Sequence, residues 1–402
     1  MSIDNSFSSS SEDSSSFDSY SEEEIDFSGK FLKNEYVIIN KLGSGTFATV
    51  WIAYNTKKTN FYAIKIIDEE EYENGLMEIE YLDKIKKSKN PYINTLIEHF
   101  IYKENGDEHV CMVFELLACS LYDVINIKKY ENGLPIGTVK SIIYQLLKAL
   151  ETLNNDLSLK HTDIKPENLL LCGLSNKSLK IIDEFKKKNC NKKMGKNKKN
   201  IKQTPSMYKK IVESLSACNY KDENKIDDNL LQINKIKIKL SDFGGCCESN
   251  DDNYSIQTRY YRAPEIILEY DNNEKSDIWS VGCVLFELLT GSILFNPKKD
   301  KRHNTDRTHI YLMESLLGKI PEHLINKSNR RVEFYTKSGF LKSFDKINYN
   351  PLSQLLIKKT FDKKDITNEE FLKMLDLLYK MFDYDTKKRY NVSQCLNHIW
   401  FK

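Results

Sequence analysis

Short runs of β-branched and aromatic residues alternate with polar turns in the first part of the chain. The runs span 36–40, 49–54 and 61–67, and Gly-rich or Lys-Lys-Thr-Asn stretches separate them. Runs of this length between turn residues predict strands, and three in close succession predict an antiparallel meander. Another apolar run, at 109–117, predicts a further strand.

Longer segments carry apolar residues at helical spacing. Within 73–87, Leu76, Ile79, Leu82 and Ile85 recur every three residues and predict a helix. The same periodicity appears again in 135–153, 276–290, 309–317 and 368–382. The predicted fold class is therefore α+β: a small antiparallel β-rich lobe with one main helix, followed by a larger, mostly α-helical lobe.

Charge is distributed unevenly along the chain. The 402 residues carry a formal net charge of only +2, so we expect no direct nucleic-acid partner. The first 29 residues nevertheless carry only acidic charges, and residues 1–33 are too polar to offset the entropy of ordering, which predicts a disordered, acidic, Ser-rich tail. Ser10, Ser11 and Ser21 lie close to acidic residues and could accept phosphate; a purely solvating tail is the alternative.

The nine cysteines include no Cys-x-x-Cys pair, which argues against zinc binding and for a reducing, cytoplasmic or nuclear setting. Cys246 and Cys247 are adjacent, but nothing near them in the sequence completes a metal or redox site. No secretory signal is recognisable and no apolar run reaches membrane-spanning length. We therefore expect neither secretion nor a membrane partner.

A long insertion interrupts a predicted hairpin. Residues 169–172 and 236–240 supply its two strands, so residues 173–234 are inserted between them. Nine lysines and no acid occur from Lys186 to Lys202, which predicts disorder or a weakly structured arm. The insertion could be a localisation signal or a site for an anionic partner, or only a solvated spacer.

Two motifs together supply what a phosphoryl transfer from Mg-ATP requires. The first is His-Thr-Asp-Ile-Lys-Pro-Glu-Asn at 161–168, and the second is Ser-Asp-Phe-Gly at 241–244. In the first, Asp163 is the candidate general base; His161 is the alternative, although a structural hydrogen bond is its expected role. The candidate cation on the transferring phosphate is Lys165, and the candidate Mg²⁺ ligands are Asn168 and Asp242.

A Gly-rich loop lies upstream, at 43–50. Because the chain continues from it as a strand and not as a helix, the loop caps a hairpin and its amides can cover phosphates, unlike a dinucleotide-binding loop. Lys65 is a charged residue on an otherwise apolar strand and needs anionic partners, which ATP phosphates and a carboxylate would provide. Glu78 is the expected carboxylate because it borders the apolar face of the next helix; Glu73 and Glu80 are the alternatives.

The segment Thr-Arg-Tyr-Tyr-Arg-Ala-Pro-Glu at 258–265 follows the second motif closely and leaves a short activation segment between them. Glu265 should be buried in the larger lobe and should pair with Arg389. Asp277 should accept backbone hydrogen bonds from the catalytic loop.

With these motifs, the chain resembles the eukaryotic protein kinases over 34–172 and 235–402. Lys165 and Thr258 are similar to the serine/threonine branch, and 258–265 resembles the CMGC group. A closer similarity, to the SR-protein kinases that phosphorylate Arg-Ser-rich splicing factors, rests on the position of the insertion and on 161–168, 256–259, 306–325 and 333–339.

The resemblance implies a two-lobed kinase fold, with 34–117 as the N-lobe and 118–402 as the C-lobe. It further implies a monomer that transfers the γ-phosphate of ATP, with Mg²⁺, to Ser or Thr of protein substrates, Arg-Ser-rich proteins among them. The catalytic residues it implies are Asp163, Lys165 and Lys65. The nucleotide-binding residues it implies are Leu42, Gly43, Ser44, Gly45, Thr46, Phe47, Val50, Ala63, Lys65, Glu78, Phe114, Glu115, Leu117 and Asn168.

The chain departs from the family pattern in three places. Thr162 replaces the arginine that pairs with activation-segment phosphate in most kinases, which predicts activity without that phosphate. Lysines interleave with acids over 358–370, where an acidic docking surface for Arg-rich substrates is expected. Pro264 is present where SR-protein kinases tend to lack it. A dual-specificity or Cdc-like CMGC kinase therefore stays an alternative, as does a pseudokinase scaffold, although the catalytic residues are all present.

Overall fold

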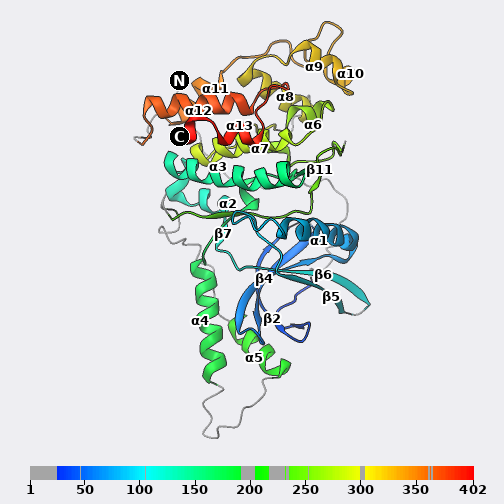
Figure 1. Cartoon of the computed structure of the whole chain (residues 1–402), viewed down its shortest axis with the longest axis vertical. Coiled ribbons are helices and arrows are strands. Elements are labelled where there is room, and N and C mark those ends of the chain that lie inside the picture. The colour runs from blue at the N-terminus through cyan, green and yellow to red at the C-terminus, as the bar shows by residue number, and fades with distance from the viewer. Residues whose placement is uncertain are drawn as a thin grey trace, which may run out of the picture.

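A six-stranded antiparallel sheet and one helix build the smaller lobe, at the lower end of Figure 1. The structure is a computed structural model that describes residues 25–45, 47–104, 106–191, 204–216, 231, 235–251, 253–298, 304–360, 363 and 365–402. The strands, in the sheet order β1-β2-β3-β4-β6-β5, are β1 (Phe31–Leu32), β2 (Tyr36–Ser44), β3 (Ala48–Asn55), β4 (Asn60–Ile67), β6 (Asp107–Phe114) and β5 (Glu98–Glu104). The predicted meander is confirmed, while β5, which has no buried residue, was not predicted.

Helix α1 (Tyr72–Lys86) packs on this sheet through the apolar positions that predicted it, with Ile79, Leu82 and Ile85 buried. Gly75 faces the sheet so closely that a Cβ there would lie 3.1 Å from Val110. The close approach fixes where the next turn of α1, which carries Glu78, lies above β4.

The larger lobe is mostly helical, as predicted, and is centred on α7 (Lys275–Thr290). This helix is buried along nearly its whole length, as is usual for a helix with apolar residues on every side. It ends at Gly291, whose φ of +67° and contact with Glu131 leave no room for a side chain. The other helices are α2 (Leu121–Ile125), α3 (Ile136–Glu151), α6 (Pro264–Leu268), α8 (Thr305–Leu317), α9 (Glu322–Lys327), α10 (Arg331–Phe334), α11 (Leu352–Thr360), α12 (Asn368–Met381) and α13 (Val392–Leu396).

Besides the six-stranded sheet, the described residues form two small antiparallel sheets. One has the order β10-β9-β7, from Ile238–Leu240, Leu169–Leu171 and Cys119–Ser120. The pairing of β9 with β10 confirms the predicted hairpin around the insertion. The other sheet pairs β8 (Leu159–Lys160) with β11 (Cys247–Glu248) and so joins the start of the catalytic loop to the start of the activation segment.

The predicted disorder or weakly structured arm at 186–202 is wrong for residues 186–191, which end the helix α4 (Asn176–Asn191). The insertion has a second helix, α5 (Pro205–Ser216). Phe185 of α4 is fully buried and contacts Tyr54 and Phe61 of the smaller lobe. Tyr208 of α5 stacks on Phe185, and both helices lie beside β2 in Figure 1. Apolar residues at helical spacing, masked in composition by the lysine run, explain the order. Residues 192–203, most of the lysine run, lie outside the described residues.

The predicted tail also ends too late. Residues 1–24 lie outside the described residues, but 25–33 belong to the smaller lobe. Phe27 is 3% exposed and packs edge-on against Trp51, and Phe31–Leu32 forms β1. Phe27, Phe31 and Leu32 stabilise this segment, although the acidic residues that precede it predicted disorder. Within the described part of the chain, no helix is both long and apolar enough to cross a membrane.

Candidate active site

Three charged side chains from distant elements meet in what we call the catalytic ion cluster: Lys65, Glu78 and Asp242. The Lys65 amine lies 2.8 and 2.9 Å from the two Glu78 oxygens and 2.8 Å from Asp242 Oδ1. Lys65 comes from β4, Glu78 from α1, and Asp242 follows β10. The predicted pairing with Glu78 is confirmed, and the alternatives Glu73 and Glu80 are exposed.

The cluster shifts the pKa of two of its members. Burial favours neutral Lys65, but the nearby Glu78 and Asp242 outweigh it and raise the pKa of Lys65 above its usual range. Burial would likewise raise the pKa of Asp242, but the charge of Lys65 outweighs it and leaves that pKa lowered. Both groups are therefore charged at neutral pH.

Strand register places the predicted nucleotide-binding residues in rows beside this cluster. Gly43 is the register partner of Val50, and Val50 is the partner of Lys65. In the adjacent row, Ala63 is the partner of Phe114. Since side chains alternate across a strand, Ala63 and Lys65 share one face of the sheet. The sheet thus carries an apolar and a cationic position side by side.

The described residues leave space around the two glycines of the Gly-rich loop. Among those residues, a Cβ on Gly43 would meet no atom within 4 Å, and a Cβ on Gly45 would meet the Ala48 carbonyl at 3.8 Å. The open side of the loop is therefore available to a ligand. Leu42 and Ser44 end β2, Phe47 is 56% exposed, and Thr46 lies outside the described residues.

Residues 115–118 connect the lobes without strand structure. Leu117 is buried, whereas the Glu115 side chain is more than half exposed and forms an ion pair with Lys239 of β10. Its carboxylate is thereby engaged outside the ion cluster. What Glu115 can offer a nucleotide is its backbone.

The catalytic loop brings Asp163, Lys165 and Asn168 together with Thr258 of the activation segment. Lys165 lies 2.7 Å from Asp163 Oδ2 and donates to the Thr258 hydroxyl at 3.1 Å. That hydroxyl in turn donates to Asp163 Oδ1 at 2.6 Å. The predicted base, the predicted cation and the activation segment therefore form one connected group.

The oxygen ligands that Mg²⁺ prefers are present beside this group. The Asn168 amide nitrogen donates to Asp163 at its carbonyl, 2.8 Å away, and at Oδ2, 3.1 Å away, which leaves Asn168 Oδ1 to act as a ligand. The Asp242 side chain is 46% exposed and uses only Oδ1 for Lys65. The donor set fits a magnesium ion held by few protein oxygens.

Two further predictions about the support of the loop are confirmed. Asp277 accepts from the backbone N–H groups of His161 and Thr162, at 2.8 and 2.9 Å. His161 accepts from Asp163 N through Nδ1, so its Nε2 donates to the carbonyl of Ser241. The imidazole is engaged at both nitrogens, which fits a structural role and not that of a base.

Thr162 occupies the position of the missing arginine in strained geometry. Its φ is +70°, uncommon for a β-branched residue, and its hydroxyl donates to the Gly245 carbonyl at 2.7 Å.

In the larger lobe, Glu265 and Arg389 form the predicted ion pair. Arg389 Nη2 lies 2.7 Å from Glu265 Oε2, and neither side chain is exposed. Cys246 and Cys247 are buried, and burial raises the pKa of Cys247 to about 11, as for an inert thiol.

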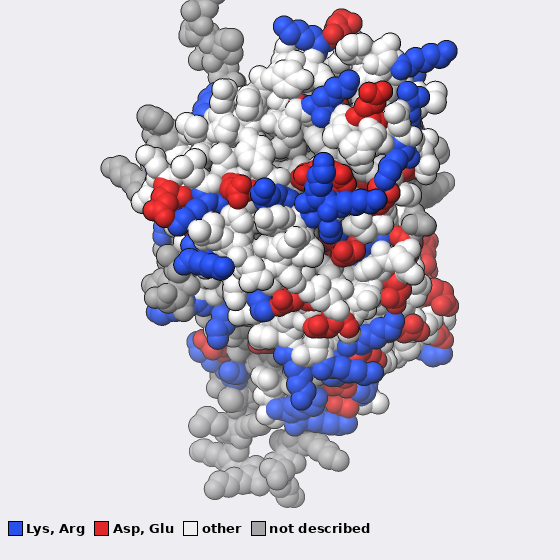
Figure 2. All heavy atoms as spheres, turned by 45° about the horizontal axis from the view of Figure 1, so that its top comes forward, with Lys and Arg blue, Asp and Glu red and all other residues white. Residues whose placement is uncertain are grey.

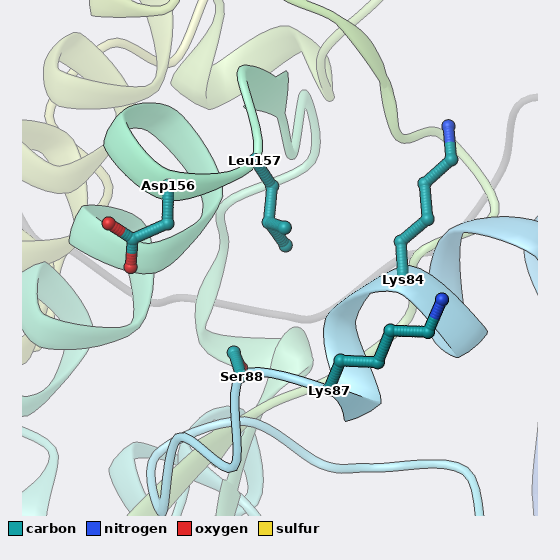
Figure 3. Close-up of a pocket in the computed structure, with 5 residues that line it drawn as sticks. All are labelled: Lys84, Lys87, Ser88, Asp156 and Leu157. Atoms are coloured by element: carbon teal, nitrogen blue, oxygen red, sulfur yellow. The ribbon is translucent and has the colours of Figure 1, made fainter.

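One cavity lies apart from these groups. It measures about 460 Å³ and is lined by Lys84, Lys87, Ser88, Asp156 and Leu157. Figure 3 shows both lysine amines and the Asp156 carboxylate turned away from Leu157. None of the predicted site residues lines it, so it is separate from the catalytic ion cluster.

Sequence reasoning missed the residues that hold the activation segment. Gln257 donates to Ser276 O and accepts from Ala263 N, and Arg262 donates to the Gln257 carbonyl. Lys160 is fully buried beneath the same segment. The one signal available was a lysine that ends the apolar run before the catalytic loop. Its acceptors leave no pattern in the sequence.

The comparisons with known proteins agree with this geometry. A family model described as "Protein kinase domain" matches residues 36–205 and 221–401. The Serine/threonine-protein kinase SRPK of Physarum polycephalum is 33% identical over 92% of this chain and 86% of its own length. Serine/threonine-protein kinase AFC3 of Arabidopsis thaliana is 31% identical (92% and 83%), and Protein kinase dsk1 of Schizosaccharomyces pombe is 28% identical (93% and 81%).

Proposed function

Since this chain belongs to the protein kinase family and is a serine/threonine kinase similar to the SR-protein kinases, we propose specific roles for its residues. Lys65, held by Glu78, binds ATP phosphates, and the loop at 43–47 covers them. Leu42, Val50, Ala63, Phe114 and Leu117, with the backbone of Glu115, enclose the base. Asn168 and Asp242 hold Mg²⁺, which neutralises charge on the phosphates.

In the transfer itself, Asp163 orients the substrate hydroxyl and takes its proton. The hydroxyl oxygen forms a bond to the γ-phosphorus while the bond from that phosphorus to the β–γ bridging oxygen breaks, and ADP leaves. Lys165 stabilises the charge on the transferring phosphoryl group. Thr258, hydrogen-bonded to both Asp163 and Lys165, ties this chemistry to the activation segment.

One observation supports the proposal above the others: the ion pairs on the nucleotide side and the hydrogen bond on the substrate side are both formed in the same structure. Lys65 is paired with Glu78 and Asp242 on one side, and Thr258 is bonded to Asp163 on the other. A pseudokinase scaffold has no need of either. γ-Phosphate transfer to an Arg-Ser peptide by wild type and by Asp163→Ala tests the roles. We expect a loss of about 10²- to 10⁴-fold in the variant; equal rates would favour the scaffold.

We propose Arg-Ser-rich proteins as the substrates, which follows from the similarity and not from surface charge. On the face shown in Figure 2, acidic and basic side chains are intermixed, and no acidic expanse is visible among the described residues. In the mixed region at 358–370, Lys363 donates to the carbonyls of Gly133 and Leu134, and Asp365 accepts from Ile136 N. These charges are used within the fold, so they neither favour nor oppose a basic substrate.

A peptide array separates the substrate classes. Arg-Ser, Ser-Pro and acidic contexts are presented at equal concentration to the purified enzyme. Preference for Arg-Ser peptides is expected. Preference for Ser-Pro or acidic peptides would favour the alternative, a CMGC kinase of the Cdc-like or dual-specificity type, and would leave the proposed catalytic roles intact.

A further inference from the structure

Lys160 is a buried lysine whose amine, among the described residues, donates to neutral oxygens. It is 0% exposed, and none of the ion pairs formed by the described residues involves its amine. The amine instead donates to the main-chain carbonyl of Asp251, 2.6 Å away, and to Asn272 Oδ1 at 3.3 Å. Fully buried lysines are rare unless paired, so a lysine held by neutral oxygens at this position needs an explanation.

Asn272 completes the arrangement from another element. Its amide nitrogen donates to the carbonyls of Asp251, at 3.3 Å, and Asn253, at 2.8 Å. Asn272 lies in the connection between α6 and α7, whereas Lys160 is on β8. Two elements of the larger lobe thus converge on two carbonyls of the activation segment. We call this group, Lys160 and Asn272 with the carbonyls of Asp251 and Asn253, the segment anchor.

The segment anchor directs a cation at the activation segment. The catalytic loop has Thr162 and offers no guanidinium, but the residue two positions earlier, Lys160, is a cation directed at the same segment. Hydrogen bonds from a charged donor are stronger than neutral ones. A carbonyl acceptor, unlike a phosphate, is always present.

The anchored stretch leads directly to the substrate side of the site. Five residues after Asn253, Thr258 donates to Asp163. Between them Gln257, with a φ of +68°, is strained and is fixed by its own side-chain bonds to Ser276 and Ser280. Holding the carbonyls of Asp251 and Asn253 therefore fixes the start of a short path through the strained Gln257, and at its end Thr258 is hydrogen-bonded to Asp163.

We propose that Lys160, together with Asn272, is a positioning residue that holds the activation segment in the substrate-accepting conformation without a phosphate. The proposal rests on the proposed function, because its consequence is the binding of a Ser or Thr peptide. Among the described residues, no side-chain hydrogen bond joins the segment anchor to Lys65, Glu78 or Asp242 on the nucleotide side of the site.

The test separates peptide binding from nucleotide binding. Lys160→Met keeps the length and apolar stem but removes the charge and both hydrogen bonds. We expect a peptide KM raised and a kcat/KM for peptide lowered by about 10- to 100-fold, with the Kd for Mg-ATP changed less than about twofold. Asn272→Ala, which keeps Lys160, should change the peptide KM and the kcat/KM for peptide less than Lys160→Met does. The double variant should fall short of the product of the single effects.

Lys363→Met is the matched control, since this half-buried lysine also donates to two carbonyls but holds 133–134 instead of the activation segment. Its peptide KM should equal that of wild type. An unchanged peptide KM in Lys160→Met, with kcat reduced only in proportion to the folded fraction, would overturn the proposal. If Lys160→Met does not fold, an unchanged peptide KM in Asn272→Ala overturns it. A wild type that phosphorylates no peptide would refute the proposed function instead.

Discussion

The two lysines Lys65 and Lys160 are held by different kinds of acceptor. In the catalytic ion cluster, Lys65 is 16% exposed and lies between two carboxylates from different elements, Glu78 and Asp242. In the segment anchor, Lys160 is wholly buried, and its acceptors among the described residues are a carbonyl and an amide oxygen. The first cation is held at an open edge where a phosphate can reach it. The second is sealed beneath the backbone it fixes.

The difference shows how the acceptors of each lysine suit its proposed role. Lys65 must stay charged, keep its place and still bind an incoming anion, and carboxylates that raise its pKa meet the first two needs. Lys160 has to hold backbone in one conformation, for which short bonds to fixed carbonyls are suited. Burial raises the pKa of the nearby Asp277, and the groups that oppose this rise include His161 and, more weakly, Lys160.

Removing the charge at Lys65 should have the largest effect. Lys65→Met leaves Glu78 and Asp242 as unpaired carboxylates at the phosphate site. We expect kcat/KM for peptide phosphorylation to fall on the order of 10³-fold, with weaker Mg-ATP binding. Steady-state kinetics and ATP titration measure both. Glu80→Gln, an exposed acid on the same helix, is the control and should match wild type.

Replacing an apolar residue of the insertion tests whether the catalytic ion cluster can be disturbed without affecting the segment anchor. Phe185 contacts Phe61 of β4, the strand of Lys65, and among the described residues no hydrogen bond or ring contact links it to Lys160. Phe185→Ala should destabilise the smaller lobe by about 3 kcal/mol and raise the KM for ATP, but not the KM for peptide. Leu179→Ala, at a position 43% exposed on the same helix, should change stability by less than about 0.5 kcal/mol.

If Phe185→Ala raised the peptide KM as much as the ATP KM, the separation of the ion cluster from the segment anchor would be wrong. Unfolding followed by urea titration, alongside the kinetics, gives both quantities on the same preparation.

A smaller effect is expected from the carboxylate near the end of the activation segment. Glu287 accepts from the Tyr261 hydroxyl at 2.6 Å, and burial raises its pKa to about 7. Because the folded form holds its proton more tightly than the unfolded form, whose pKa is near 4.5, Glu287 should cost stability as the pH rises from about 4.5 to 7.

Glu287→Gln removes this titration and keeps an acceptor for Tyr261. The free energy of unfolding of wild type relative to the variant should therefore fall by on the order of 2 kcal/mol between pH 5 and pH 8. Parallel pH profiles for the two proteins would contradict the raised pKa.

The catalytic ion cluster could be predicted from sequence because each member carries a local signal. Lys65 interrupts an apolar strand, Glu78 borders the apolar face of a helix, and Asp242 lies in a recognisable motif. Burial of a charge requires a partner, and these were the charges available. Strand register places Lys65 beside Val50, whereas the packing of α1 and the segment after β10 bring Glu78 and Asp242 to the lysine.

The segment anchor and the insertion helices carry weaker signals, for different reasons. The acceptors of Lys160 are backbone carbonyls, which every residue has, so no side-chain pattern marks them. In the insertion, Tyr208, Ile211 and Val212 have helical spacing and are buried. Their order depends on contact with Tyr54, far away in the sequence, while the lysine run dominated the composition.

Thr162 and the segment anchor together predict a kinase that needs no phosphate on its activation segment. The direct measurement compares phosphorylation of an Arg-Ser peptide by enzyme treated with a broad-specificity phosphatase and by untreated enzyme, with mass spectrometry confirming that residues 243–265 carry no phosphate. We expect equal kcat and equal peptide KM for the two preparations. A collapse of the rate after treatment, restored when the enzyme is incubated with Mg-ATP, would contradict it.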